Sequence, residues 1–213
     1  MKKLFYLFIG ISSFTFQAQQ VGILKYDGGG DWYANPTALP NLIKFTNRNC
    51  KTAIQKNIAT IKTNDEDIFN LPIIFMTGHG NVFFSEEDIL NLKNYLTSGG
   101  FLHISDNYGM DKYIRKELKK VFPDLKLQEI PKNHPIYHQT FSFPNGLPKI
   151  HEHDKKPPQG LGLFHKNRLI VFYDHESDLS DGWEDKEMHN NPEPTRLKAL
   201  KMGANIIEYA FKN

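Results

Sequence analysis

Short apolar runs bounded by turn residues recur along the first half of the chain and predict buried strands. Residues 21–26 (VGILKY), 71–77 (LPIIFMT) and 101–105 (FLHIS) are runs of this kind. Their length and continuous apolar character are typical of strands covered on both faces. Residues 57–62 (NIATIK) alternate between apolar and polar positions and predict a further strand.

Helix signals lie between these strands. Pro36, after Asn35, suits the first position of a helix. Residues 85–88 (SEED) have the pattern of a capping box, and residues 111–121 predict a helix with a basic face. Because strands and helices alternate, the sequence predicts an α/β fold with a mostly parallel sheet covered by helices.

The second half of the chain has a different pattern. We expect an edge strand at 125–130, a long loop with short strands at 131–158, a hairpin of strands 160–165 and 168–174, a polar loop at 177–192 and a closing helix at 195–211. No linker or repeat divides the chain, so we predict one domain over residues 19–213.

The N-terminus has the layout of a secretory signal peptide. Lys2 and Lys3 precede an apolar run from residue 4 to 16, and Ala18 offers a cleavage position. The run is shorter than the roughly 20 residues that cross a bilayer. We predict that residues 1–18 are a signal peptide, that the mature chain has no transmembrane anchor, and that the protein is periplasmic or secreted. A buried N-terminal helix is the alternative.

Charge and cysteine content exclude some partners. Without Lys2 and Lys3, the 26 basic residues become 24 and equal the 24 acidic ones. This balance does not favour binding to nucleic acid, which attracts basic proteins. Cys50 is the single cysteine, so no intramolecular disulfide forms, and no nucleophile motif surrounds it.

Ionisable and polar residues follow three of the predicted strands. In parallel sheets, ligands bind outside the carboxyl ends of the strands. We therefore predict a site at this edge, with His79 and Asp106 as catalytic candidates. The ligand-binding candidates are Asp31, Trp32, Tyr33, Asn81, Asn107, Tyr108 and Trp183.

Most of these residues also have a structural interpretation. Glycines 28–30 either cradle a phosphate or form a turn, and Trp32 and Tyr33 either stack on a ligand or cover the core. His79 is either a base, a metal ligand or an oxyanion donor, or it bonds to a loop carbonyl. Asn107 either lines the site or caps a turn.

Residues 151–154 (HEHD) raise the question of a metal site. In an extended segment His151 and His153 point to the same face, so both can bind one divalent metal such as zinc, with Asp154 or a distant group. The alternative is that both histidines hydrogen-bond to carboxylates. His134 and His138 form a second pair, and residues 181–185 (DGWED) with His189 add acids and an imidazole.

Several motifs carry a resemblance to a known family. They are GGGDWYANPTALPNL, MTGHGN, SGGFLHISDNYGMD, KKVFPD, NHPIYH, GLPKIHEHDKKPPQG and DGWED. With them the chain resembles the domain of unknown function 4159 family over nearly the whole mature chain. The resemblance implies a class I glutamine amidotransferase-like, flavodoxin-like fold with helices on both faces of the sheet, and it implies no activity.

One residue type that the wider superfamily uses is missing. Its glutaminases place a cysteine at a turn after a central strand, and residues 99–106 hold none. The chain is therefore not expected to hydrolyse glutamine by that route. Ser105 also lacks the G-x-S-x-G context of a serine nucleophile.

Three functions are compatible with these patterns. The first is an exported protein that binds a small polar ligand, such as a carbohydrate, in a His/Asp-rich pocket at the strand edge. The second is a metal-dependent or acid/base hydrolase that uses the same pocket. The third is a structural partner whose polar edge is covered by another chain, of unknown identity.

Overall fold

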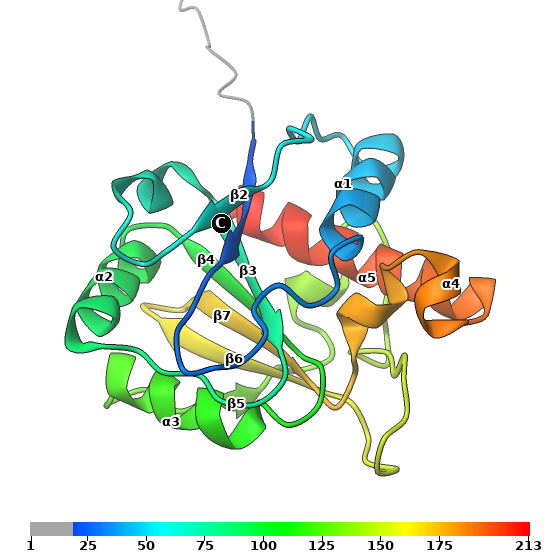
Figure 1. Cartoon of the computed structure of the whole chain (residues 1–213). Coiled ribbons are helices and arrows are strands. Elements are labelled where there is room, and N and C mark those ends of the chain that lie inside the picture. The colour runs from blue at the N-terminus through cyan, green and yellow to red at the C-terminus, as the bar shows by residue number, and fades with distance from the viewer. Residues whose placement is uncertain (1–18) are drawn as a thin grey trace, which may run out of the picture.

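The computed structural model describes residues 19–213 (Figure 1), so the predicted signal peptide, residues 1–18, lies outside the described residues. The described part of the chain has seven strands: β1 (Val21–Leu24), β2 (Ala59–Ile61), β3 (Ile73–Gly78), β4 (Phe101–Asp106), β5 (Gln128–Glu129), β6 (Gln159–His165) and β7 (Arg168–His175). Its helices are α1 (Ala38–Asn49), α2 (Glu86–Thr97), α3 (Asp111–Val121), α4 (Lys186–His189) and α5 (Glu193–Lys212). Short 3-10 turns are η1 (Glu66–Asn70), η2 (Pro135–Tyr137) and η3 (Leu179–Gly182).

All seven strands form one sheet in the order β2-β1-β3-β4-β7-β6-β5. The first five in this order are parallel, whereas β6 runs antiparallel to both of its neighbours. The predicted α/β class with a mostly parallel sheet is therefore confirmed. The edge strand that we expected at 125–130 is the two-residue β5.

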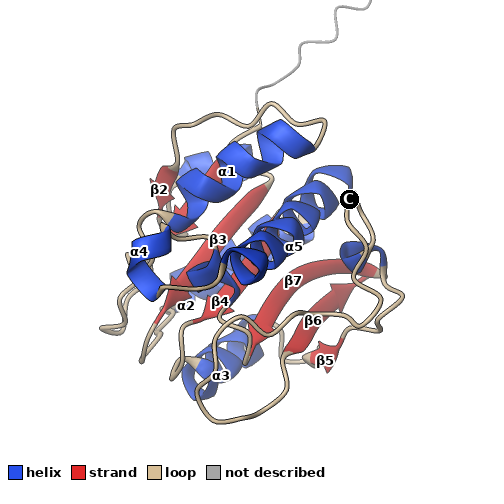
Figure 2. Ribbon diagram, turned by 90° about the vertical axis from the view of Figure 1, so that its right-hand side faces the viewer, coloured by secondary structure: helices blue, strands red, loops and turns tan. Residues whose placement is uncertain are grey.

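Helices cover both faces of the sheet (Figure 2). Along β3, Ile73 and Phe75 pack with α1 and α5, whereas Ile74 and Met76 pack with α2 and α3. This alternation is the two-residue period of a strand, and it explains why residues 73–76 (IIFM) are all apolar.

Local sequence signals are realised at several element ends. The Ser85 hydroxyl accepts a hydrogen bond from the Asp88 N–H, and the Asp88 carboxylate accepts one from the Ser85 N–H, as a capping box requires. Lys166 and Asn167 turn the β6–β7 hairpin with positive φ angles of 47° and 66°. Positive φ at both central residues matches the right-handed twist of hairpin strands.

Two loops differ from expectation. Between residues 131 and 158 the described chain has η2 and a single bridge between His138 and Ser142, where we expected short strands. His134 caps η2 by accepting from the Ile136 N–H at 3.2 Å, so a turn uses the backbone groups that a strand would pair. Residues 177–192 contain η3 and α4, where we expected only a loop.

None of the helices found among residues 19–213 combines the length and the apolar character that crossing a bilayer requires.

Candidate functional site

The carboxyl ends of four parallel strands bring distant segments together. Gly78 at the end of β3 lies opposite Asp106 at the end of β4, and Ser105 of β4 lies opposite Asp174 of β7. The segments that follow β1, β3, β4 and β7 therefore meet at one edge of the sheet (Figure 1). We call this region the carboxyl edge.

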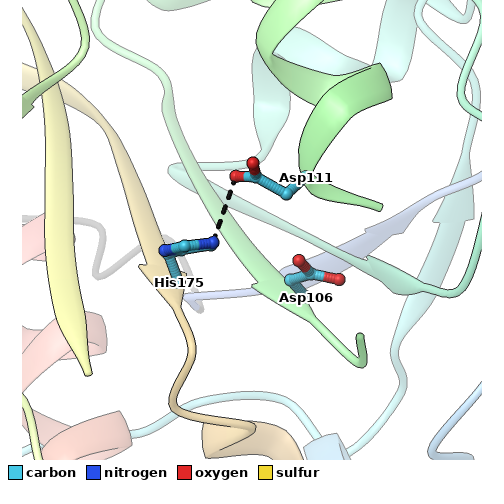
Figure 3. Close-up of side chains that lie close together, drawn as sticks. All are labelled: Asp106, Asp111 and His175. Carbon is cyan, nitrogen blue, oxygen red and sulfur yellow. Dashed lines mark ion pairs between the residues drawn. The ribbon is translucent and has the colours of Figure 1, made fainter. Parts of the chain in front are cut away.

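Two carboxylates and an imidazole converge at the carboxyl edge (Figure 3). Asp106 ends β4, Asp111 begins α3, and His175 ends β7. One ligand atom from each lies within 4.8 Å of the other two, and His175 Nε2 lies 3.4 Å from Asp111 Oδ1. Among residues 19–213, this is the one group of three histidine, cysteine or acidic side chains so arranged.

Tyr173 links the two carboxylates of this group. It lies two residues before His175 on β7, so both side chains face α3. The Tyr173 hydroxyl lies 2.9 Å from Asp106 Oδ2 and 3.0 Å from Asp111 Oδ1, and it can donate its one proton to only one of them. Burial and the two nearby carboxylates raise the pKa of Tyr173.

The charge of Asp106 is poorly compensated. Its carboxylate accepts the Met110 N–H at 3.0 Å, and burial raises its pKa. Asp111 pairs with Arg115 at 2.7 Å, whereas no lysine or arginine in the described chain pairs with Asp106. Two carboxylate oxygens and one imidazole nitrogen form a donor set that suits Zn²⁺ or Mn²⁺.

A second ionisable pair lies beside this group. His79 follows β3, and its Nδ1 lies 3.0 Å from Asp31 Oδ2, while its backbone N–H donates to Asp31 Oδ1. Partial burial alone would raise the pKa of Asp31, but the hydrogen bonds from His79 outweigh that effect and lower it. The His79 side chain is 56% exposed, and no hydrogen bond holds its Nε2 within the described residues.

Gly78 makes this pair possible. Its φ of 139° disfavours other residues, and a Cβ there would overlap the Tyr26 hydroxyl and would lie 2.9 Å from the Asp31 carbonyl oxygen and 3.0 Å from its Oδ1. The glycine next to His79 therefore serves close approach of the Asp31 segment. A carboxylate that orients a histidine in this way is the usual support of a general base.

The aromatic candidates after β1 differ in exposure. Trp32 is half-buried and has Lys25 Nζ 5.3 Å from its ring centroid, whereas Tyr33 is 66% exposed. Their rings meet edge to face at 5.5 Å. Asn81 is exposed, and its carbonyl accepts the Gly30 N–H at 3.0 Å. Tyr33 and Asn81 are thus accessible to a ligand.

Asn107 and Tyr108 occupy two environments after β4. Asn107 is buried, and its Oδ1 accepts from the Ser180 hydroxyl at 3.1 Å, whereas its Nδ2 has no partner among the described residues. Tyr108 has a positive φ of 77° and an exposed ring. That ring stacks on His153 with 4.4 Å between centroids, so residues 151–154 reach the carboxyl edge.

His153 contacts a carboxylate. Its Nε2 lies 2.7 Å from Asp178 Oδ2. Burial and neighbouring acids raise the pKa of Asp178 to about 8, and burial and His151 lower that of His153. The contact has ion-pair distance without hydrogen-bond geometry, because Asp178 Oδ2 accepts no hydrogen bond among the described residues, so the hydrogen-bonding interpretation also stays a prediction. The rings of His151 and His153 lie 4.9 Å apart and no third ligand joins them in the described chain, so a metal at this pair stays a prediction.

The remaining polar candidates are engaged elsewhere. Asp154 pairs with Lys156, and His138 Nε2 lies 2.8 Å from the Lys132 carbonyl oxygen. His189 lies 3.0 Å from Glu184 Oε2. Trp183 is fully buried and donates its indole N–H to the Ala199 carbonyl at 2.9 Å. The structure thus places Trp183 in the core, where a surface ligand does not reach it.

A buried pair lies beneath the carboxyl edge on the α5 face of the sheet. His103 Nε2 lies 2.6 Å from Asp174 Oδ2, and the Ser105 hydroxyl donates to Asp174 Oδ1 at 3.0 Å. Burial lowers the pKa of His103 to about 3 and raises that of Asp174. Both shifts favour neutral groups that share one proton.

Sequence reasoning found Asp106 and missed its partners Asp111, Tyr173 and His175. Asp111 begins the helix predicted at 111–121, and His175 follows a predicted hairpin strand whose place in the sheet cannot be predicted from the sequence. The available signal was the run of ionisable residues 174–176 (DHE) at the end of an apolar strand.

The fold and this edge define the class: an α/β protein with a mostly parallel sheet whose acids and histidines gather where the strands end. Comparison with known families gives one match, described as Domain of unknown function (DUF4159), over residues 20–211. The chain belongs to this family. No curated protein matches the chain.

Proposed function

We propose that the protein is a metal-dependent hydrolase of a small polar ligand, with Asp106, Asp111 and His175 as the metal ligands. The single observation that carries this proposal is the convergence of three ligand atoms within 4.8 Å at the carboxyl edge. Parallel α/β sheets bind ligands at this edge, where the ends of several strands contribute side chains.

The chain's own residues have distinct roles in this proposal. A divalent cation held by Asp106, Asp111 and His175 would supply Lewis acidity and would lower the pKa of water there. Asp31 orients His79 through Nδ1, so His79 Nε2 takes a proton from the attacking water or gives one to the leaving group. The Tyr173 hydroxyl lies between the two carboxylates and donates its proton to one of them at a time.

The strand order supports the flavodoxin-like form of the fold. The parallel strands run β2-β1-β3-β4-β7, which corresponds to the order 2-1-3-4-5 of that fold. In this arrangement the order reverses between β1 and β3, and ligands bind at that point. Asp31 follows β1 and His79 follows β3, so the pair lies at the expected crevice.

Exposed aromatic rings favour a second candidate, the binding of a carbohydrate without hydrolysis. Tyr33 is exposed in the segment that carries Asp31, which pairs with His79. Tyr108 is exposed in the segment that follows Asp106. Aromatic faces next to carboxylates and amides suit the apolar faces and hydroxyls of sugars. In either case we propose an exported protein, on the basis of the N-terminal sequence.

A metal titration tests the proposal directly. Chelator-treated protein is titrated calorimetrically with Zn²⁺ and Mn²⁺, as are the variants Asp111→Asn and His175→Ala. We expect about one ion per chain, and at least about tenfold weaker binding in both variants because each loses one ligand atom. Asp124→Asn and His165→Ala, which lie outside the site, serve as controls.

Turnover is then measured on chromogenic glycosides, esters and phosphates. We expect hydrolysis of one class that needs the metal, and loss of that hydrolysis in His79→Ala with metal binding intact. The metal site would be refuted if the original protein bound neither ion, or if Asp111→Asn and His175→Ala bound the ion as tightly as the original protein. Sugar binding without turnover on any substrate would establish the second candidate.

A further inference from the structure

Positive charge is concentrated in one segment of a chain that is balanced overall. Residues 32–64 contain Lys44, Arg48, Lys51, Lys56 and Lys62, and no aspartate or glutamate. The whole chain has 26 basic and 24 acidic residues. Lys44, Arg48, Lys51 and Lys56 lie on α1 and the connection to β2, whereas Lys62 follows β2 beside Asp65 and Asp88.

Three of the cations line a surface cavity beside α1. The cavity has a volume of about 500 Å³, and its lining is Pro40, Ile43, Lys44, Asn47, Arg48 and Lys56. This volume lies in the range of small-molecule sites. The lining contains no carboxylate, and no ion pair in the described chain uses Lys44, Arg48 or Lys56.

Asn47 holds the two walls of the cavity together. Its Nδ2 donates to the Ile54 carbonyl at 2.8 Å, and its Oδ1 accepts the Ile54 N–H at 2.9 Å. The Thr52 hydroxyl also donates to Asn47 Oδ1, at 2.9 Å. These bonds fasten the segment that carries Lys56 to the helix that carries Lys44 and Arg48.

The arrangement repels its own charges. Lys44 and Arg48 are four residues apart on α1, and like charges at this spacing destabilise a helix. An oxyanion bound between them and Lys56 would remove the repulsion. Arginine also presents paired N–H groups that match phosphate and carboxylate oxygens.

We propose that this cavity binds a small amphipathic anion, with a phosphate or carboxylate group on Lys44, Arg48 and Lys56 and an apolar portion against Pro40, since Ile43 of the lining is only 2% exposed. The cavity is separate from the carboxyl edge. α1 begins at that edge, where Thr37 contacts Glu184, and runs back toward the start of β1, where the Gln55 N–H donates to the Gln19 carbonyl. The proposal is therefore independent of the proposed hydrolase.

Calorimetric titration with hexyl phosphate and inorganic phosphate tests the proposal. We expect hexyl phosphate to bind at least about tenfold more tightly than phosphate, because its chain buries apolar surface. The double variant Lys44→Gln/Arg48→Gln should lose at least about tenfold in affinity for both. The control double variant Lys93→Gln/Lys116→Gln, on α2 and α3, should bind as the original protein does, and urea unfolding checks that all variants fold.

Each other outcome overturns the proposal. Equal affinity in the two double variants would show that the cavity is not the site. Equal affinity for phosphate and hexyl phosphate would show that the cavity does not bind the apolar part of the ligand. Binding to phosphatidylglycerol vesicles without binding to hexyl phosphate would assign the charges to a membrane surface.

Discussion

At the scale of single residues, strand alternation decides which ionisable groups meet. On β7, Tyr173 and His175 face α3 and join Asp106, whereas Asp174 between them faces the other layer and joins His103. Adjacent residues thus serve two clusters with different chemistry. One cluster has an exposed side through Asp111, and the other is buried and neutral.

The raised pKa of Asp178 leads to a prediction about stability and pH. A carboxyl group with a pKa of about 8 keeps its proton in the folded protein, while the unfolded chain releases it near pH 4. Because of this group, the free energy of unfolding decreases as pH rises from about 4 to about 8. Above about pH 8 the group causes no further decrease.

Asp178→Asn should remove this loss. Asparagine tolerates the positive φ of 53° at this position. We expect the variant to be about 1 kcal/mol or more stable than the original protein at pH 8, with a smaller difference at pH 5. Urea unfolding at pH 5, 7 and 9 measures it, and a difference that does not change with pH would contradict the assigned pKa.

Burial of Trp183 leads to a second prediction. Trp183→Phe removes buried volume and leaves the Ala199 carbonyl without its indole donor, so we expect a loss of about 2 kcal/mol. Trp32→Phe, at a half-buried ring, should cost less than about 1 kcal/mol. Denaturant midpoints of the two variants give the comparison, and equal costs would show that Trp183 is not a core residue.

At the scale of elements, the ends of the parallel strands carry the function, and glycine sets their geometry. Gly78 ends β3 where Asp31, from the segment after β1, approaches its backbone. Gly29 has a positive φ of 88°, but nothing lies within 4 Å of a Cβ built there. Glycine is therefore required at position 78 by both the backbone conformation and a close neighbour, and at position 29 by the backbone conformation alone.

Substitution by alanine at these two glycines tests this difference. Gly78→Ala should cost about 3 kcal/mol, since it combines backbone strain with clashes against the Tyr26 hydroxyl and Asp31. Gly29→Ala should cost about 1 kcal/mol from strain alone. Gly78→Ala should also weaken any activity that depends on the Asp31–His79 pair. Urea unfolding measures the stabilities, and similar losses in both variants would mean that contact at Gly78 is unimportant.

At the scale of the whole molecule, the candidate metal site depends on the order of strands. His175 reaches Asp106 and Asp111 because β7 lies beside β4 in the sheet, although 69 positions separate Ser105 from Asp174, which bond across this pair. The site thus ties the β6–β7 hairpin to the α3 layer. A cation bound there would stabilise the folded state relative to the unfolded chain.

The effect of a cation on thermal unfolding should depend on pH. Burial raises the pKa of Asp106, so a proton competes with the cation, and affinity rises as pH increases through that pKa. At a free concentration of 100 times Kd, the stabilisation is about 2.7 kcal/mol, or about 5 to 10 °C in Tm for a domain of this size.

We therefore expect the Tm gain with Zn²⁺ or Mn²⁺ to be larger at pH 8 than at pH 5. Asp106→Asn should abolish the gain, and His165→Ala should retain it. Differential scanning calorimetry with and without the ion measures both variants. A gain of the same size in Asp106→Asn would place the cation elsewhere.

Features that depend on neighbouring residues could be read from the sequence. The bounds of α3, the capping box at Ser85 and the buried character of β3 follow from periodicity and end signals within about ten residues. The placement of His79 and Asp106 at strand ends follows in the same way. The net charge of the whole chain, by contrast, is close to zero and does not reveal that residues 32–64 carry basic residues and no acidic ones.

Which strands are neighbours in the sheet depends on the tertiary structure. A hairpin can pair with either edge of a sheet, and only packing of the whole chain selects the place of β7 next to β4. That choice adds Asp111, Tyr173 and His175 to Asp106, and it buries Trp183 against α5. Most helices and strands, and the residues at their ends, could be predicted from the sequence because they depend on local periods and caps; the loops at 131–158 and 177–192 could not. The tertiary structure determined the site, because its atoms converge only through long-range packing.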